Sequence, residues 1–262
     1  MKIFYRISET SNSQHAKQRT WQVKLPNATK QNCLLNTLEC FPTAEVTVFV
    51  DSITDETWQW LNTLDRITLV KIQEGSDAKS MRYLLNEAMK ITDNTEIVLF
   101  QEDDYLYVEQ AEHKIIESLK YAHYTTGYMH PDKFMSVDKG GNPFTPSDNV
   151  SEPTQVIMTS DHFWMITNST TNTFATTVGT IKEDMDIWLW GTEDLINTKD
   201  FAIFLKLREK GRALVQPIPS LATHCLKGFE APTVGLNINS WEDPLPGVRL
   251  PYGDTPLTFT PQ

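Results

Sequence analysis

The segment Glu96-Ile-Val-Leu-Phe-Gln-Glu-Asp-Asp-Tyr-Leu106 decides how the fold is interpreted, because an apolar strand pattern runs directly into three consecutive carboxylates. Placing Glu102, Asp103 and Asp104 at the end of a buried strand is unfavourable unless a cation neutralises them. Hard oxygen ligands suit Mg²⁺ or Mn²⁺, and such ions usually share their coordination shell with substrate phosphates. The alternative for this segment alone is a solvated acidic turn. The segment indicates a strand with a candidate metal or phosphate site at its carboxyl end.

Strand and helix patterns alternate before the acidic segment. Period-two patterns predict strands over residues 2–8, 45–51 and 67–72, and helical periodicity predicts helices from Asn27, from Ser52 and over 77–91. The order β-α-β-α-β-α-β predicts right-handed crossovers and a mostly parallel sheet flanked by helices, an α/β fold of Rossmann type. Ligands collect at the carboxyl ends of such strands, so the polar side chains of Tyr5-Arg6 and Asp51 are expected to lie beside the acidic triplet.

The second half of the chain has a different pattern. A helix is predicted over 109–123, followed by a Gly-, Pro- and Asp-rich segment, and the later elements are strands at 155–165, 172–177 and 213–217 and helices at 181–190 and 200–210. The tail from residue 227 holds six of the fourteen prolines, which predicts an extended arm rather than a further domain.

Composition limits the possible functions. A chain of 262 residues with 40% hydrophobic residues can bury a substantial core as one large unit. The net charge is −11, and no basic run is longer than a pair, which argues against nucleic acid or an anionic membrane as a partner. No apolar stretch reaches the roughly 20 residues of a transmembrane helix or the pattern of a signal peptide, so a cytoplasmic location is expected. An odd count of three cysteines indicates reduced thiols.

Three sequence elements together resemble a glycosyltransferase of the GT-A fold, over roughly residues 2–225. The acidic segment is similar to the Asp-x-Asp motif in a Glu-Asp-Asp variant. The segment from Asp200 to Gly211 resembles the inverting family's acidic segment followed by an apolar helix, with Asp200 eleven residues before the glycine, although Lys199 stands where that family has Glu. The segment Ile218-Pro-Ser-Leu-Ala-Thr-His224 resembles a late strand that bears a metal-binding histidine.

The resemblance implies roles for these residues. Asp104 and His224 would bind the metal, with Mn²⁺ favoured over Mg²⁺ because of the imidazole, and Glu102 would lie near the ribose or the metal, with Asp103 beside it. Asp200 would be the catalytic base, with Asp194 as the rival. Alone, His224 is more simply a hydrogen-bonded core histidine, and Asp200 a helix-dipole partner or cap.

Four further residues are candidates for nucleotide binding. Tyr5 or Arg6 would stack on or hydrogen-bond the base, and Asp51 would accept from a base N–H or a ribose hydroxyl. Arg82 would face the diphosphate, since an Arg fork suits phosphate oxygens. The simpler alternatives are an N-cap role for Asp51, for the helix after residue 52, and a surface ion pair of Arg82 with Asp77 or Glu87.

The function implied by the resemblance is metal-dependent transfer of a hexose from a UDP-sugar to a carbohydrate, lipid-linked glycan or other hydroxyl acceptor, by an inverting reaction. Residues 1–125 would form the nucleotide-sugar-binding half, 126–225 the acceptor and catalytic half, and 226–262 the C-terminal arm. A bacterial or bacteriophage enzyme of polysaccharide biosynthesis would be compatible with this resemblance. The alternatives are a retaining mechanism, a sugar nucleotidyltransferase, and a non-catalytic carbohydrate-binding protein on the same fold. The loop over residues 8–22 argues against a sugar nucleotidyltransferase, because it contains no glycine.

Overall fold

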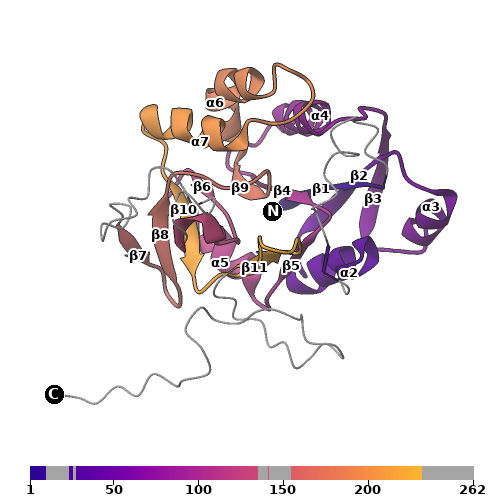
Figure 1. Ribbon diagram of the computed structural model, residues 1–262, viewed down its shortest axis with the longest axis horizontal. Helices are drawn as coiled ribbons and strands as arrows, with labels where there is room; N and C mark the ends of the chain where they lie inside the picture. Colours follow the sequence, from indigo (N-terminus) through magenta and orange to yellow (C-terminus); the bar gives the residue numbers. More distant parts are fainter. Residues whose placement is uncertain (10–23, 26–27, 135–140, 142–154, 232–262) are drawn as a thin grey trace, which may run out of the picture.

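The fold is a large mixed sheet between two layers of helices (Figure 1). The computed structural model describes residues 1–9, 24–25, 28–134, 141 and 155–231. Its strands are β1 (Lys2–Ser8), β2 (Glu45–Asp51), β3 (Ile67–Ile72), β4 (Ile97–Glu102), β5 (Tyr105–Tyr107), β6 (Tyr124–Thr125), β7 (Val156–Met158), β8 (Phe163–Thr167), β9 (Phe174–Thr177), β10 (Leu214–Ile218) and β11 (Ala222–His224). Its helices are α2 (Lys30–Cys40), α3 (Asp55–Leu61), α4 (Asp77–Met89), α5 (Ala111–Ser118), α6 (Val178–Gly191), α7 (Asp200–Glu209) and the 3₁₀ helix η1 (Pro131–Phe134).

The sheet order confirms the predicted α/β fold. Nine strands pair in the order β3-β2-β1-β4-β9-β6-β10-β8-β7, and the first four of these are parallel to one another. Beyond β4 the pairing becomes mixed, because β9 lies antiparallel to both β4 and β6. The parallel part places the carboxyl ends of β1, β2 and β4 at one edge, where ligands collect in such sheets.

Alternation along β1 divides the core between the two faces of the sheet. Ile3, Tyr5 and Ile7 pack with the apolar side chains of α2, α3 and α5, whereas Phe4 packs with those of α4, α6 and α7. Figure 1 shows part of this division, with α4, α6 and α7 above the sheet and α2 below it. Because successive strand residues point to opposite faces, Tyr5 and Arg6 cannot approach one ligand from the same side.

Three hydroxyl N-caps fix where the helices of the first half begin. The side chains of Thr29, Thr54 and Ser76 each accept a hydrogen bond from the backbone N–H three residues on, at the starts of α2, α3 and α4. The alternative of Asp51 as a cap is wrong, because Thr54 fills that position.

Several boundaries in the second half differ from the prediction. Residues 155–165, which were predicted as one strand, contain the hairpin of β7 and β8. The helix predicted over 109–123 is shorter, and only α5 (Ala111–Ser118) is α-helical. The polar tract 167–173, from the end of β8 to the start of β9, is mostly buried. Most of the predicted C-terminal arm lies outside the described residues. None of the described helices is long and apolar enough to cross a membrane.

Gly191 permits the close contact between α6 and α7. A Cβ atom at this position would lie 2.1 Å from Cγ1 and 2.3 Å from Cδ1 of Ile203, which is completely buried. Such distances are far inside van der Waals contact, and packed cores have little room to relax. A side chain at position 191 would therefore force α7 away from α6.

The variant Gly191→Ala is expected to lower the free energy of unfolding by about 1–3 kcal/mol, because it overpacks a filled core. Urea denaturation of the two single variants and of the double variant with Ile203→Ala measures the coupling. The double variant should be more stable than the sum of the two single effects predicts, since removing the isoleucine also removes the clash. If the losses in free energy of unfolding were additive, the contact with Ile203 would not limit the size of the side chain at position 191.

Candidate active site

Two short strands bring the late histidine to the acidic strand end. β11 pairs antiparallel with β5, so His224 lies opposite Tyr105, and the backbone N–H of Cys225 donates to the carbonyl oxygen of Asp104 at 2.8 Å. The His224 Nε2 atom then lies 3.4 Å from Oδ2 of Asp104. The structure thus brings together two residues that are 120 positions apart in the chain.

The imidazole of His224 is held by aromatic rings. The Tyr105 ring stacks on it with a centroid separation of 4.7 Å and an interplanar angle of 9°. Tyr128 meets it edge-on, and Phe229 lies 5.9 Å away. This packing fixes the direction of the two ring nitrogens, which is a requirement for a preorganised ligand.

Asp104 and His224 fit a divalent ion. Nearest ligands in an octahedral shell lie about 3 Å apart, so the 3.4 Å separation of Asp104 Oδ2 and His224 Nε2 suits two neighbouring positions. Asp104 Oδ1 and His224 Nδ1 are buried and have no hydrogen-bond partner among the described residues. Buried polar atoms without partners are rare, and an ion or its bound water beside the Asp104 carboxylate would satisfy Oδ1, whereas His224 Nδ1 points away from the edge of the ring that bears Nε2.

The two groups favour each other's charged forms. Burial opposes the charge on His224, but the neighbouring Asp104 carboxylate raises the pKa of the imidazole above its ordinary value. Burial also opposes the charge on Asp104, and His224 together with Lys24 and Lys30 holds its pKa well below the usual range. The carboxylate is therefore ionised and available to a cation at neutral pH.

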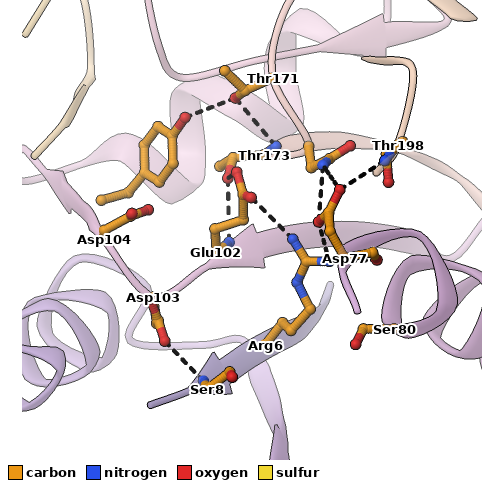
Figure 2. A network of polar contacts seen from close by, with 12 residues as sticks. Arg6, Ser8, Asp77, Ser80, Glu102, Asp103, Asp104, Thr171, Thr173 and Thr198 are labelled. Carbon is orange, nitrogen blue, oxygen red and sulfur yellow. Dashed lines mark hydrogen bonds and ion pairs between the residues drawn. The ribbon is translucent and has the colours of Figure 1, made fainter. Parts of the chain in front are cut away.

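Arg6 links Glu102 to the start of α4 (Figure 2). Its Nη2 donates to Glu102 Oε1 at 2.9 Å, and its Nη1 lies 2.6 Å from Asp77 Oδ1. Asp77 also accepts from the backbone N–H of Thr198 at 2.8 Å and from Asn172 Nδ2. Arg6 was predicted to contact the base, but here it neutralises two carboxylates and ties three loops to the end of β4.

Burial is the main influence on the pKa of Glu102. It raises the pKa of Glu102 to about 7, although Arg6 opposes the rise. Thr173 contacts the same residue, since its Oγ1 accepts from Glu102 N at 3.2 Å. Glu102 therefore lies at the strand end as predicted, with Arg6 already bound to it.

Asp103 faces the other side of the strand end. Its Oδ2 accepts from Ser8 N at 2.9 Å, as Figure 2 shows, and from Lys30 Nζ. Its Oδ1 lies 3.6 Å from Lys24 Nζ, which is also 3.4 Å from Asp104 Oδ2. Burial lowers the pKa of the Lys24 ammonium, but the carboxylates of Asp103 and Asp104 raise it above its ordinary value. Two lysines thus neutralise the acids that Arg6 does not reach.

The two candidates for the catalytic base differ in their surroundings. Asp200 is the first residue of α7, accepts from Phe201 N at 2.7 Å, and has its pKa raised to about 7 by burial. The backbone N–H of Thr198, two residues earlier in the chain, donates to Asp77, so the start of α7 lies beside the acidic strand end. Asp194 is exposed and accepts from Ile196 N and Asn197 N, so it stabilises its own turn.

Two further predicted nucleotide contacts, those of Tyr5 and Arg82, do not fit the structure. Tyr5 has no exposed surface and packs beneath α2, so it cannot stack on a base. Arg82 donates to Thr192 Oγ1 and to the Leu189 carbonyl oxygen at the end of α6, which uses its guanidinium to join two helices. Its alternative is also wrong, since Asp77 pairs with Arg6 and Glu87 with Lys90.

Asp51 lies at the predicted strand tip, but it is 3% exposed. Its Oδ1 accepts from Ser52 Oγ, and its Oδ2 accepts from Gly75 N at 2.9 Å and lies 3.2 Å from Ser80 Oγ. The carboxylate closes the β3–α4 loop onto β2. A contact with ribose or base stays a prediction for this residue.

Sequence reasoning missed several residues of the site. Asp77 was considered only as a partner of Arg82, although an acid at the start of a helix that follows β3 points toward the strand ends. Lys24 and Lys30 were not considered at all, and their only sequence signal is their place between β1 and α2. The buried tract 167–173 was passed over because polar residues are mostly exposed.

A second group of metal-ligating side chains lies elsewhere in the described part of the chain. Ligand atoms of His113, Glu117 and Asp161 lie within 4.8 Å of one another. His113 and Glu117 are on α5 and Asp161 is in the β7–β8 turn, not at the carboxyl ends of the parallel strands. Glu117 already accepts from the backbone N–H and hydroxyl of Ser160, which explains its position as a contact that holds the turn.

No family model matches the chain, and no curated protein matches it significantly. Among solved structures, the chain is similar to the galactosyltransferase LgtC in complex with donor and acceptor sugar analogs, with 10% identity, a TM-score of 0.47, and coverage of 82% of this chain and 73% of that one. It is also similar to residues 1–349 of S. aureus TarS, with 16% identity, a TM-score of 0.46, and coverage of 82% and 57%.

A third similar structure is CMP:2-keto-3-deoxy-manno-octonic acid synthetase complexed with CTP, with 9% identity, a TM-score of 0.45, and coverage of 82% of this chain and 87% of that one. The similar structures thus include both a galactosyltransferase and a synthetase complexed with CTP. At these identities and TM-scores the likeness does not decide the reaction, which depends on the site's own side chains.

Proposed function

We propose that the protein is a divalent-metal-dependent glycosyltransferase that transfers a hexose from a UDP-sugar to a hydroxyl group of a carbohydrate or lipid-linked glycan, with inversion at the anomeric carbon. The observation that carries this proposal is the Asp104–His224 pair, whose Oδ2 and Nε2 atoms lie 3.4 Å apart, with both side chains mostly buried, at the carboxyl ends of parallel strands. A metal and a nucleotide diphosphate together suit that position.

The departing diphosphate gains negative charge as the bond to the sugar breaks. A divalent ion held by Asp104 and His224 would neutralise this charge when bound. Glu102 is fixed by Arg6, and Asp103 is fixed by Ser8 N and Lys30, so the acidic segment keeps its shape without an ion. A site whose side chains are already positioned loses less entropy on binding its ligand.

Asp200 supports the choice of an inverting reaction. An inverting base must lie opposite the leaving group and take the proton of the acceptor hydroxyl as its oxygen bonds to the anomeric carbon. Asp200 belongs to a different element from the acidic segment, yet it experiences the charges of Asp77 and His224. A carboxyl group with a pKa near 7 is well matched to accepting a proton at neutral pH.

Polar atoms around the site suit a sugar. Thr170 Oγ1, Asn172 Oδ1 and Thr198 Oγ1 are buried and lack hydrogen-bond partners among the described residues. Asn172 and Thr198 both contact Asp77, whose carboxylate pairs with Arg6. Sugar hydroxyls both donate and accept, so they are suitable partners for these atoms.

The variant Asp104→Ala is expected to abolish the stabilisation of the protein by UDP in the presence of Mn²⁺, because it removes a carboxylate ligand. Thermal melts with and without Mn²⁺ and with UDP, GDP, CDP and ADP measure this. Asp194→Ala is the control, since Asp194 is an exposed turn residue. A wild-type protein whose melting temperature does not respond to any of these diphosphates would contradict the proposal.

The variant Asp200→Asn should lower kcat for sugar transfer by about 10²–10⁴-fold, with the affinity for Mn²⁺ and UDP unchanged. In the wild type, the rate should rise as the pH increases through about 7, since Asp200 must lose its proton to act as a base. UDP release from a panel of UDP-sugars with candidate acceptors measures both effects, and Asp194→Asn should stay within about threefold. The reverse ranking would identify Asp194 as the base. Release of pyrophosphate from a nucleoside triphosphate and a sugar phosphate would identify a nucleotidyltransferase, and glycan binding without any turnover would identify a binding protein.

Asp200→Asn should also stabilise the fold in a pH-dependent way. The raised pKa means that the folded state resists the loss of the Asp200 proton, so this residue destabilises the folded protein progressively as the pH rises from about 4 to about 7. The asparagine keeps an acceptor for Phe201 N and carries no charge. Because Asp200 retains some exposure, we expect a gain of about 1–2 kcal/mol at pH 8 that shrinks at pH 5. Urea denaturation at both pH values measures it, and a gain that is larger at pH 5 would contradict the assignment.

A further inference from the structure

The backbone of Lys24 is anchored beside the metal-ligand pair. Residues 24 and 226 form an isolated antiparallel bridge, and Leu25 N donates to the Cys225 carbonyl oxygen at 3.0 Å. The Leu25 side chain is buried with Ala28, Cys33, Leu106 and Cys225. The position of Lys24 is therefore set by its backbone and by its neighbour, and does not depend on its own side chain.

The side chain of Lys24 places a cation on the carboxylate that would bind the metal. Its Nζ lies 3.4 Å from Asp104 Oδ2, the same oxygen that is 3.4 Å from His224 Nε2. It also lies 3.6 Å from Asp103 Oδ1. An ammonium here neutralises the carboxylates and repels a second cation that approaches the same oxygen.

We propose that Lys24 is a built-in competitor of the divalent ion: its ammonium occupies the cation position at Asp103 and Asp104, and it must move away when the ion binds to Asp104 and His224. This inference rests on the proposed function, since it needs an ion at that pair. It assigns to Lys24 a role in setting metal affinity, so that the ion is retained only when a further ligand, such as a diphosphate, adds to its binding.

The geometry permits this exchange. The Lys24 side chain is 41% exposed, and its flexible four-carbon chain can carry the ammonium into water without disturbing the backbone anchor. The ion pair itself is partly solvated and easily given up. When Lys24 leaves, Asp103 keeps its contacts with Ser8 N and Lys30, so the acidic segment retains its shape.

Lys30 provides a matched comparison. It carries the same charge and pairs with Asp103 Oδ2, with its side chain 23% exposed, but no ion pair joins it to Asp104. If any loss of positive charge near the acids raised the metal affinity, removing either lysine would raise it by the same amount. Competition for the metal-binding oxygen concerns Lys24 alone.

The test is a titration of the full chain with Mn²⁺ in the absence of nucleotide, with free Mn²⁺ followed by electron paramagnetic resonance. We expect Lys24→Gln to bind Mn²⁺ about tenfold more tightly than the wild type, because the competing charge is gone. Lys30→Gln should change the affinity by less than about threefold, and Lys24→Arg, which keeps the charge, should also stay within about threefold. Far-UV circular dichroism and melting temperatures check that each variant folds.

The role of Lys24 alone would be overturned if the wild type binds Mn²⁺ and UDP but Lys24→Gln binds Mn²⁺ no more tightly. Equal gains in Mn²⁺ affinity in Lys24→Gln and Lys30→Gln would also overturn it. A gain in Lys24→Arg as large as in Lys24→Gln would overturn it as well, since the effect would then come from packing rather than charge. If neither the wild type nor Lys24→Gln binds Mn²⁺ at millimolar concentration, and UDP does not stabilise either protein, the proposed function fails together with this inference.

Discussion

The site depends on the neutralisation of carboxylates that the fold gathers at one sheet edge. Asp77, Glu102, Asp103 and Asp104 meet there, and the permanent cations that pair with them are Arg6, Lys24 and Lys30. His224 can supply a fourth positive charge, because the neighbouring Asp104 carboxylate raises the pKa of its imidazole. Buried charge without a partner is strongly unfavourable, so the carboxylates of this group depend on the cations beside them.

The cations are divided between the two faces of the sheet. Arg6 reaches across the α4 side to Glu102 and Asp77, whereas the lysines approach Asp103 and Asp104 from the α2 side. The ion pairs of Arg6 are harder to exchange than those of the lysines, because its planar guanidinium makes several hydrogen bonds at fixed angles and its side chain is only 10% exposed. The lysines hold their acids as point charges, which are easier to exchange.

Most of the fold was predictable from local patterns. The strands over 2–8, 45–51 and 67–72 and the acidic strand follow from apolar periodicity, and their parallel order follows from the intervening helices. The opposite orientations of Tyr5 and Arg6 were also predictable from the period of a strand, so the pairing of both with one ligand was an avoidable error. The true N-cap Thr54 was likewise visible, since hydroxyl residues are preferred caps.

The site itself was less predictable, because its parts come from contacts between distant segments. The pairing of β11 with β5 decides that His224 meets Asp104, and nothing in either short segment specifies its partner. Lys24 reaches the acids only because residues 24–25 pair with 225–226. Local sequence patterns report burial and periodicity, while such long-range pairings depend on the packing of the whole chain.

The proposed catalytic base lies apart from the proposed metal site, and the surrounding charges explain why. Under the proposed function, the charges that would stabilise the leaving group lie at β4, β5 and β11, where closely spaced acids and bases neutralise one another. A proton acceptor must instead avoid a strong cationic partner, since a paired carboxylate is too weak a base. Asp200 meets that condition: it begins α7, its pKa is raised to about 7 by burial, and no lysine or arginine pairs with it among the described residues. Under the proposed function, the ionised carboxylate of Asp104 would bind the metal, and Asp200 would accept the proton of the acceptor hydroxyl.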